Sequence, residues 1–499
     1  MRRIQSVAIA NRGEVAVRII HACRELGIRT VLLHSEADVG TRAYRMADVR
    51  MCIGPAATAA SYLSIDRCVT GALAGKADAV HPGFGFLSEN ADFAQAVIDA
   101  GLIFIGPKPS SIRAVGDKIA AKKTIAQANA PSVPGYMGDD QRVETLVNEA
   151  ARIGFPVIVK AAAGGGGRGM KVIRSREEAI EQIASAQREG LAAFGSSIVF
   201  LEKYLDHAKH IEFQIFGDSG GEVSYLFERE CTVQRRHQKI IEEALSPVLT
   251  PELRRAMGET AVRLAQSADY QGAGTVEFLL QDGNFYFLEM NTRLQVEHCV
   301  TEMVLGVDLV KAQIMNAAHE FRVWPQDSLV AHGHAIEARI YAENPYAGGI
   351  PSTGTILGME WPEGPGRRFE TGIEAGDEVT PHYDSMIAKV IVWDETRLRT
   401  IKKLKATLAE SLVLGVHTNI PLVREMISHP EFIEGTMTTQ FVGQHFPEGL
   451  SSRERSPKEL EFQKMASSAM TAVARPSTPG DAGPASPNLW YSGGRWSNV

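Results

Sequence analysis

The sequence has 499 residues, 44% of them hydrophobic and 22% charged, which is typical of a globular protein of about three domains. The net charge of -7, without a basic block or a basic amphipathic helix, argues against nucleic-acid and membrane surfaces, so we expect small molecules and proteins as partners. Five widely spaced cysteines without a C-x-x-C pair indicate neither a disulfide framework nor a zinc site. The apolar run near Met1 is too short for a signal peptide and no segment reaches transmembrane length, so we expect a cytoplasmic protein.

The first hundred residues predict a doubly wound parallel sheet. A buried strand at 6–10 leads through a turn into a helix at 14–26 and a second strand at 30–34. Gly13 stands alone where a dinucleotide fold has G-x-G-x-x-G, which excludes NAD as the ligand. The segment H-P-G-F-G-F-L-S-E-N predicts a rigid turn of structural role, with Ser88 as the N-cap of the next helix.

A glycine run follows the strand predicted at 157–161, after a helical stretch at 116–129. The backbone N–H groups of Gly164–Gly169 can approach phosphates closely, because glycine allows positive φ. Met170 stands where a Walker A loop requires Lys, and no phosphate-binding helix follows. We therefore expect a mobile lid over a nucleotide, with a plain flexible loop as the alternative.

Polar residues then alternate with apolar ones in two strands. His210, Glu212 and Gln214 are expected on one face of a strand at 210–216. Charges of both signs crowd residues 228–239, where Arg235, His237 and Lys239 alternate, a pattern that suits an anionic substrate. A solvated charged strand is the alternative.

The densest group of functional side chains lies between Thr275 and Glu302. Two alternating apolar strands joined by D-G-N predict a hairpin that places Glu277, Glu289 and Asn291 together. Two carboxylates and an amide oxygen are hard ligands, so the hairpin predicts a magnesium site. Arg293 and Glu297 follow as an anion clamp and a candidate base. The alternative is a half-buried hairpin with surface charges.

These features together resemble the ATP-grasp superfamily, and six blocks narrow the resemblance to biotin carboxylase over about residues 1–446. In chain order the blocks are I-A-N-R-G-E-V-A-V-R, H-P-G-F-G-F-L-S-E-N, K-A-A-A-G-G-G-G-R-G-M, R-E-C-T-V-Q-R-R-H-Q-K, E-M-N-T-R-L-Q-V-E-H and Y-D-S-M-I-A-K. The sequence departs from the family where Phe84 and Ala163 stand, and again at 437–441, beside the expected adenine site.

The resemblance implies that bicarbonate attacks the γ-phosphate of MgATP to give carboxyphosphate, which yields CO₂ and phosphate beside biotin. It implies the cofactors ATP, Mg²⁺ or Mn²⁺, and biotin carried on a separate protein. The implied ATP-binding residues are Lys118, Lys160, Gly165, Gly166, Glu202, Lys203, Tyr204, Leu205, His210, Gln234 and His237. The implied metal ligands are Glu277, Glu289 and Asn291, and the bicarbonate residues are Lys239, Arg293, Gln295 and Val296. Glu297 resembles the base and Arg339 the cation at the biotin enolate, so the catalytic set is Arg293, Glu297, Lys239 and Arg339.

The resemblance also implies the domain organisation, a mixture of α/β and α+β. We expect an N-terminal doubly wound domain at 1–116, an ATP-grasp domain at 117–330 with its lid at about 131–204, an α+β domain at 331–449, and a disordered tail at 450–499. No A-M-K-M-like segment is present to carry biotin. The expected partners are therefore a biotin carboxyl carrier protein and carboxyltransferase subunits, in a homodimer or a larger complex.

Two other functions fit parts of the pattern. Another ATP-grasp carboxylate-amine ligase would share the ATP residues, but Arg339 and the Q-R-R-H-Q-K block count against it. A catalytically inactive nucleotide-binding scaffold is the second alternative, and the complete set of acid, base and metal residues counts against it.

Overall fold

The structure is a computed structural model that describes residues 3–116, 125, 128–161, 170–236 and 238–451. One compact unit spans Met1–Leu450. The predicted helix at 116–129, the glycine run and most of the expected tail lie largely outside the described residues. Among the described helices, none has the length and apolar run that a membrane span needs.

The N-terminal part is a parallel sheet, as the sequence predicts, and its five strands have the order β3-β2-β1-β4-β5. Alternate residues of β1 pack on opposite faces: Val7 and Ile9 pack with α1, whereas Ala8 packs with α3 and α4. Helices therefore cover both faces of the sheet. The elements are β1 Ser6–Ile9, α1 Gly13–Glu25, β2 Arg29–Ser35, α2 Arg42–Met46, β3 Val49–Gly54, α3 Ile65–Ala74, β4 Ala79–His81, α4 Ala91–Asp99, β5 Ile103–Phe104 and α5 Pro109–Gly116.

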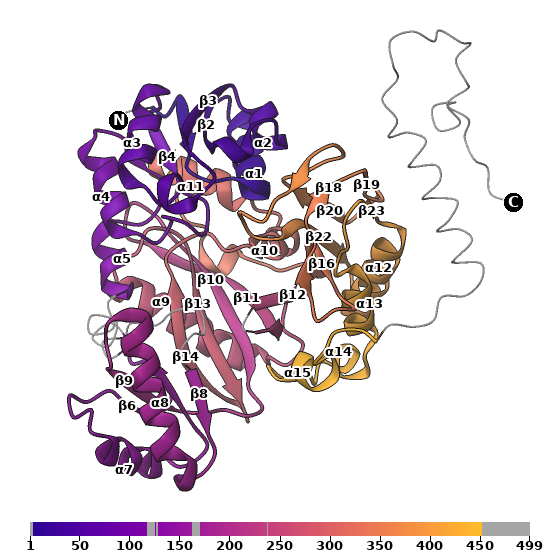
Figure 1. The fold of residues 1–499 in the computed structure, drawn as a ribbon. Coiled ribbons are helices and arrows are strands. Elements are labelled where there is room, and N and C mark those ends of the chain that lie inside the picture. Colours follow the sequence, from indigo (N-terminus) through magenta and orange to yellow (C-terminus); the bar gives the residue numbers. More distant parts are fainter. Residues whose placement is uncertain (1–2, 117–124, 126–127, 162–169, 237, 452–499) are drawn as a thin grey trace, which may run out of the picture. The chain divides into compact units, whose positions relative to one another are not determined.

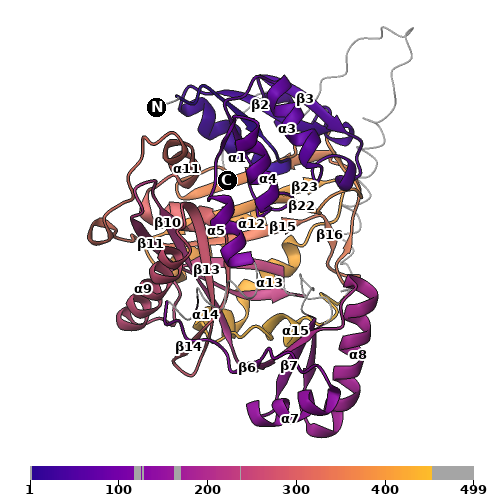
Figure 2. The ribbon, with the colours of Figure 1, turned by 90° about the vertical axis from the view of Figure 1, so that its left-hand side faces the viewer.

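A four-stranded antiparallel sheet in the order β6-β9-β7-β8 occupies the segment where the lid is expected. Its elements are β6 Gly135–Tyr136, α7 Val143–Ile153, β7 Val157–Ala161, β8 Met170–Ile173, α8 Arg176–Phe194 and β9 Val199–Lys203. Lys160 at the end of β7 pairs with Met170 at the start of β8, so these two strands are neighbours in the sheet. Figure 2 shows α7 and α8 together beside this sheet, with which they share one apolar core.

The largest sheet has eight strands in the order β14-β13-β10-β11-β12-β15-β22-β20. These are β10 Lys209–Gly217, β11 Val223–Arg235, β12 Gln238–Ala244, β13 Gly272–Gln281, β14 Asn284–Asn291, β15 His334–Tyr341, β20 Arg367–Thr371 and β22 Met386–Asp394. The sequence places Arg339 in a different lobe from the hairpin. Its strand β15 nevertheless pairs with β12, so the sheet runs without a break from the hairpin into the C-terminal part (Figure 1).

Residues 228–239 do not form one alternating strand. Arg235 ends β11 and pairs with Gln238 at the start of β12, and between them Arg236 has a φ of 53°. The chain turns here, so Arg235 and Lys239 lie on different strands. The Arg235 side chain forms an ion pair with the carboxylate of Glu343.

The remaining helices pack against the large sheet or complete the C-terminal part, whose main core joins β15 and β22 to the last helices. The helices are α9 Pro251–Ser267, α10 His298–Leu305, α11 Leu309–Ala317, α12 Arg397–Glu410, α13 Ile420–Ser428, α14 Pro430–Glu434 and α15 Phe441–His445. Short strands also occur, at β16 Glu343–Asn344, β17 Ile350–Pro351, β18 Gly354–Thr355, β19 Gly358–Glu360, β21 Glu378–Val379 and β23 Leu412–Leu414.

Candidate active site

The predicted hairpin is present as β13 and β14. Asp282 and Gly283 form its two-residue turn with φ values of 52° and 75°, the positive pair that suits tight antiparallel hairpins. Glu277 lies opposite Glu289, and Asn291 lies opposite Thr275. Residues two apart along a strand share a face, so the three expected metal ligands share one face of the hairpin.

Glu277 is buried and serves as a junction for several neighbours. Its Oε1 accepts hydrogen bonds from Lys239 Nζ at 3.0 Å, Asn291 Nδ2 at 2.9 Å and Gln295 Nε2 at 3.0 Å. His210 Nε2 lies 2.9 Å from its other oxygen. Burial opposes ionisation, but Lys239 and His210 hold the pKa of Glu277 well below its ordinary value. Glu277 is therefore a fixed anion.

Glu289 has a different environment. It is exposed to solvent, and among the described residues its carboxylate has no hydrogen bond or ion pair. Partial desolvation and the charge of Glu277 raise the pKa of Glu289. Two carboxylates and one amide on one face, with too little positive charge at the Glu289 end, fit a hard divalent cation such as Mg²⁺.

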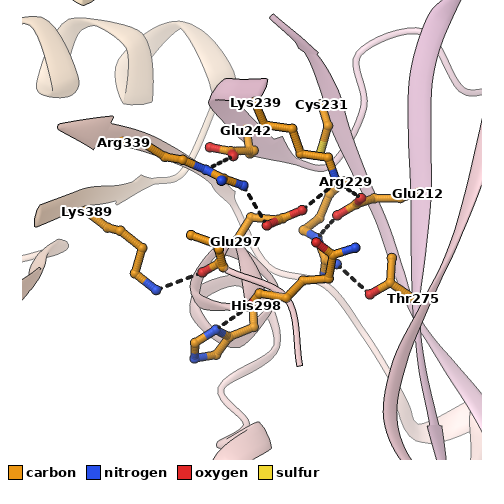
Figure 3. Close-up of polar contacts among 12 residues, drawn as sticks. Glu212, Arg229, Cys231, Lys239, Glu242, Thr275, Glu297, His298, Arg339 and Lys389 are labelled. Carbon is orange, nitrogen blue, oxygen red and sulfur yellow. Dashed lines mark hydrogen bonds and ion pairs between the residues drawn. The ribbon is translucent and has the colours of Figure 1, made fainter. Parts of the chain in front are cut away.

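Glu297 lies at the N-cap of α10 and is fully buried. Its Oε1 accepts a hydrogen bond from Lys239 Nζ at 2.7 Å, and its Oε2 accepts one from Arg339 Nη2 at 2.9 Å. Figure 3 shows the two cations approaching this carboxylate. Despite burial, Lys239, Arg339 and Arg229 hold the pKa of Glu297 well below its ordinary value. The carboxylate is ionised at neutral pH and can accept a proton.

A buried ion pair lies next to this cluster. The sequence analysis did not identify it as part of the site. Arg229 pairs with Glu212, and both side chains are fully buried. Arg229 also donates to Gln214 Oε1 at 2.7 Å. It donates in addition to Thr275 Oγ1 at 3.0 Å (Figure 3). Glu212 in turn pairs with Lys239. A Glu among the apolar residues of β10 was the available signal, because a buried carboxylate requires a partner.

Arg339 is held between two carboxylates. Its Nε donates to Glu242 Oε1 at 2.5 Å while its Nη2 reaches Glu297. Glu242 is fully buried, and its other oxygen has no hydrogen-bond partner within the described chain. Burial raises the pKa of Glu242 to about 7, although Arg339 lowers it. Nothing in the sequence pattern near Glu242 pointed to this contact.

Backbone contacts support the segment that precedes α10. The buried Lys389, from the Y-D-S-M-I-A-K block, donates to the Val296 carbonyl oxygen at 2.7 Å (Figure 3). The same ammonium lies 3.3 Å from a Glu14 carboxylate oxygen. A strand of the C-terminal part and a helix of the N-terminal part therefore meet at the predicted bicarbonate residues.

Arg293 connects the site to the segment at 81–90. Its Nε donates to Glu89 Oε2 at 3.0 Å, and Glu89 Oε1 accepts from the Thr292 backbone N–H at 3.0 Å. The predicted cap at Ser88 is wrong: Asn90 is the N-cap of α4, and its side chain accepts from Phe93 N. The segment at 81–90 was expected to have only a structural role, but its Glu89 also orients Arg293.

The expected nucleotide residues Lys160 and Glu202–Leu205 lie in and beside the lid, whereas His210 lies against Glu277. Lys160 pairs with Glu202 across β7 and β9, and Lys203 donates to two backbone carbonyls at 2.9 Å. Tyr204 lies below the Arg174 guanidinium, and Leu205 is partly buried. Gln234 Nε2 lies 2.8 Å from His210 Nδ1, which connects it to Glu277. Lys118, Gly165, Gly166 and His237 lie outside the described residues.

The lid group and the Glu277–Glu297 cluster are not joined directly. Among the described residues, no hydrogen bond or ion pair connects Lys160 or Glu202 to Glu277 or Glu297. The structure thus brings together the metal, bicarbonate and base residues predicted from the sequence, and keeps the predicted ATP residues of the lid apart from them.

Three family models match the chain in order. They are the biotin carboxylase N-terminal domain at residues 3–112, the carbamoyl-phosphate synthase L chain ATP-binding domain at 117–320, and the biotin carboxylase C-terminal domain at 337–444. The biotin carboxylase of Nostoc is 46% identical over 441 residues, which cover 88% of this chain and 99% of that protein. The alpha subunit of mitochondrial methylcrotonoyl-CoA carboxylase from Dictyostelium discoideum is also 46% identical, but the match spans only 64% of its length.

Solved structures agree with these matches. The Campylobacter jejuni biotin carboxylase, in a complex with a form of ATP, has a TM-score of 0.85 and 40% identity, covering 89% of this chain and 99% of that one. The biotin carboxylase domain dimer of Hydrogenobacter thermophilus 2-oxoglutarate carboxylase, with MgADP, ADP and bicarbonate, has a TM-score of 0.86 and 43% identity. The second match covers 91% of this chain and all of that one.

Proposed function

The chain belongs to the biotin carboxylase family, and we propose that it performs the first half-reaction of a larger biotin-dependent carboxylase. The activity is ATP-dependent carboxylation of biotin, with bicarbonate as the carbon source and Mg²⁺ as the metal. The observation that carries the assignment to this site is the buried Glu297 carboxylate between Lys239 and Arg339, at 2.7 and 2.9 Å. This arrangement supplies a base and two cations at one point.

The charge balance of the cluster suits proton removal from bicarbonate. Glu297 is ionised before substrate binds because Lys239 and Arg339 lie against it. When the Glu297 carboxylate takes the bicarbonate proton, it becomes neutral and its electrostatic attraction to the two cations weakens. Lys239 and Arg339 can then turn to the new anion, so the charge created on the substrate is met by groups already in place. Lys239 remains positioned by Glu212 and Glu277.

Arg339 then serves the biotin step. Carboxyphosphate breaks down to CO₂ and phosphate, the phosphate takes the N1′ proton of biotin, and the ureido oxygen becomes negative. A planar guanidinium held by Glu242 is suited to stabilise that oxygen. The contact with Glu89 orients Arg293 next to Asn291 for the bicarbonate anion.

Glu277, Glu289 and Asn291 would hold Mg²⁺, which supplies charge neutralisation on the phosphates when bound. Their donor set fits the ion, since all three offer oxygen ligands from adjoining strands. The proposed ATP contacts are Lys118, Lys160, Gly165, Gly166, Glu202–Leu205, His210, Gln234 and His237.

The chain spans about two thirds or less of the length of the methylcrotonoyl-CoA carboxylase subunits it matches. Those relatives are subunits of biotin-dependent carboxylases. We propose that a biotin carboxyl carrier protein and carboxyltransferase subunits are the partners of this chain, and that the chain divides at about residues 116, 330 and 449. Copurification of the chain and identification of its partners would name the final acceptor.

The test of the activity is an assay of the purified chain with MgATP, bicarbonate and free biotin. A biotin carboxylase should release ADP only with bicarbonate present, and added biotin should stimulate that release and become carboxylated. Another carboxylate-amine ligase would be indifferent to biotin, and an inactive scaffold would bind nucleotide without turnover. Glu297→Gln provides the control for contaminating ATPases, because it should retain nucleotide binding without bicarbonate-dependent cleavage.

A further inference from the structure

Two histidines and a glutamate converge at the short helices α14 and α15. His445 Nε2 lies 2.8 Å from Glu431 Oε1, and the rings of His429 and His445 have centroids 4.2 Å apart. One potential ligand atom from each of the three side chains lies within 4.8 Å of the others. All three retain contact with solvent, so an ion can reach them.

The positions of these side chains are fixed by buried packing. The His429 ring contacts the fully buried Phe441 at a centroid distance of 5.2 Å. Arg397 donates to the Phe432 and Ile433 carbonyl oxygens of α14, at 2.6 and 2.7 Å, and its Nε pairs with Glu243 at 2.7 Å. The backbone that presents the ligands is therefore tied to the core of the C-terminal part, which lowers the cost of ordering a site.

The donor set selects the kind of ion. Imidazole nitrogens with one carboxylate oxygen suit Zn²⁺ and similar divalent transition metals, whereas Mg²⁺ and Ca²⁺ prefer oxygen ligands alone. Without an ion, a partly exposed Glu431–His445 pair would contribute little to stability. We propose that His429, Glu431 and His445 form a binding site for a divalent transition metal of the Zn²⁺ class, with water completing its coordination.

A bound ion would close the segment from 429 to 445 into a loop. This segment contacts the strand that leads to the proposed ATP residues: Lys209 Nζ donates to the Gly435 carbonyl oxygen at 2.8 Å and also to that of Met437. Gln440 Nε2 donates to Asp206 Oδ1 at 3.3 Å. The metal would therefore stabilise the segment from 429 to 445, which contacts Asp206 and Lys209.

The test uses the full chain after dialysis against a chelator, with Mg²⁺ and ADP in excess so that the hairpin ligands are occupied. Calorimetric titration with Zn²⁺ should show one ion bound per chain, and Co²⁺ should give the visible absorption of a nitrogen- and oxygen-ligated site. His445→Gln should weaken binding at least tenfold. His429 is the N-cap of α14, where its Nδ1 accepts a hydrogen bond from the Glu431 backbone N–H at 3.3 Å. His429→Asn should therefore also weaken binding at least tenfold while keeping an acceptor at the N-cap.

His417→Ala is the matched control, since this exposed histidine lies outside the cluster. It should bind Zn²⁺ like the wild type. Thermal melts in chelator give the baseline of each variant, and added Zn²⁺ should raise the melting temperature of the wild type and of His417→Ala more than that of His445→Gln and His429→Asn. Absence of a bound ion, or equal Zn²⁺ affinity in the wild type, His445→Gln and His429→Asn, would overturn the proposal.

Discussion

The two ends of the candidate active site balance their charges differently. At the buried end, Glu297 is paired with Lys239 and Arg339 before any substrate is present. At the hairpin end, Glu289 faces solvent beside the Glu277 anion, and the pKa of Glu289 is raised rather than lowered. Among the described residues, the protein's own cations pair with Glu297 and with Glu277, but not with Glu289.

This difference separates two catalytic tasks. Bicarbonate is a small anion with few contacts to offer, so its end must be preorganised by groups that the fold already holds in place. Magnesium arrives with its own charge, so leaving Glu289 without a cationic partner among the described residues favours its binding. Substitutions at the two ends should therefore affect activity and stability in different proportions.

The largest effect is expected at the base. Glu297→Gln should lower bicarbonate-dependent ATP cleavage by about 10²- to 10⁴-fold, because a neutral amide cannot accept the proton. ADP affinity should change little, since Lys239 keeps Glu212 and Glu277, and Arg339 keeps Glu242. Steady-state rates and ADP titration measure the two quantities. Glu259→Gln, on the exposed side of α9, is the control. A collapse of nucleotide affinity would move Glu297 into the ATP site.

Arg339→Ala should cost about 3 kcal/mol in biotin carboxylation, the usual effect of removing an oxyanion donor. Bicarbonate-dependent ATP hydrolysis without biotin should fall much less, because carboxyphosphate forms before biotin reacts. Arg339→Lys keeps the charge but loses the planar fork, so its loss should be intermediate. Both activities would be assayed with free biotin and with a biotinylated carrier. Equal losses in the two would assign Arg339 to the ATP step or to the fold.

The hairpin end allows a direct comparison of two carboxylates. Glu277→Gln and Glu289→Gln should both lose most Mg²⁺-dependent turnover while the fold survives. Glu277→Gln should also lower the free energy of unfolding by about 1–3 kcal/mol, since Lys239 and His210 lose a buried anion. Glu289→Gln should stay within about 0.5 kcal/mol of the wild type, because Glu289 is exposed.

Urea unfolding without Mg²⁺, together with turnover at limiting Mg²⁺, measures this contrast. Wild-type-like rates at limiting Mg²⁺ in either variant would contradict the metal assignment. Equal destabilisation by the two substitutions would show instead that Glu289 has a structural partner, and the difference between the two ends would disappear.

The sequence predicted the parts of the site that are close together in the chain. The hairpin and the Glu277–Glu289 pairing follow from alternation and from turn residues, which act locally. Contacts between segments far apart in the sequence could not be predicted from alternation or from turn residues. Glu89 reaches Arg293 across 204 positions, and Lys389 reaches Val296 across 93. No periodicity encodes such pairs.

The continuity of the sheet was missed for a related reason. β12 and β15 are separated by α9, the hairpin, α10 and α11, so nothing local shows that they pair. The cap at Asn90 was missed because Ser and Asn are both good N-cap residues, and only the position of the first helical turn distinguishes them.

The last expected effect is on stability and concerns Glu242, which links Arg339 to the buried end. Burial raises the pKa of Glu242 from 4.5 to about 7 in the folded state, so between these values the folded chain binds a proton that the unfolded chain has lost. Its contribution to stability must therefore fall as pH rises from about 4.5 to 7. Glutamine does not ionise, so the stability of the wild type relative to Glu242→Gln should fall by at least about 1 kcal/mol over this range.

The neighbouring Glu243 provides a control of opposite sign. His334 and Arg397 outweigh burial and lower the pKa of Glu243, so its contribution should be present above pH 4.5 and be lost as pH falls further. Urea unfolding of the wild type, Glu242→Gln and Glu243→Gln at several pH values measures both trends. A flat difference between the wild type and Glu242→Gln from pH 4.5 to 7 would mean that Glu242 ionises at its ordinary pKa. Arg339 would then already be fully balanced by two ionised carboxylates at pH 5, and the buried end would gain nothing from keeping one of them protonated.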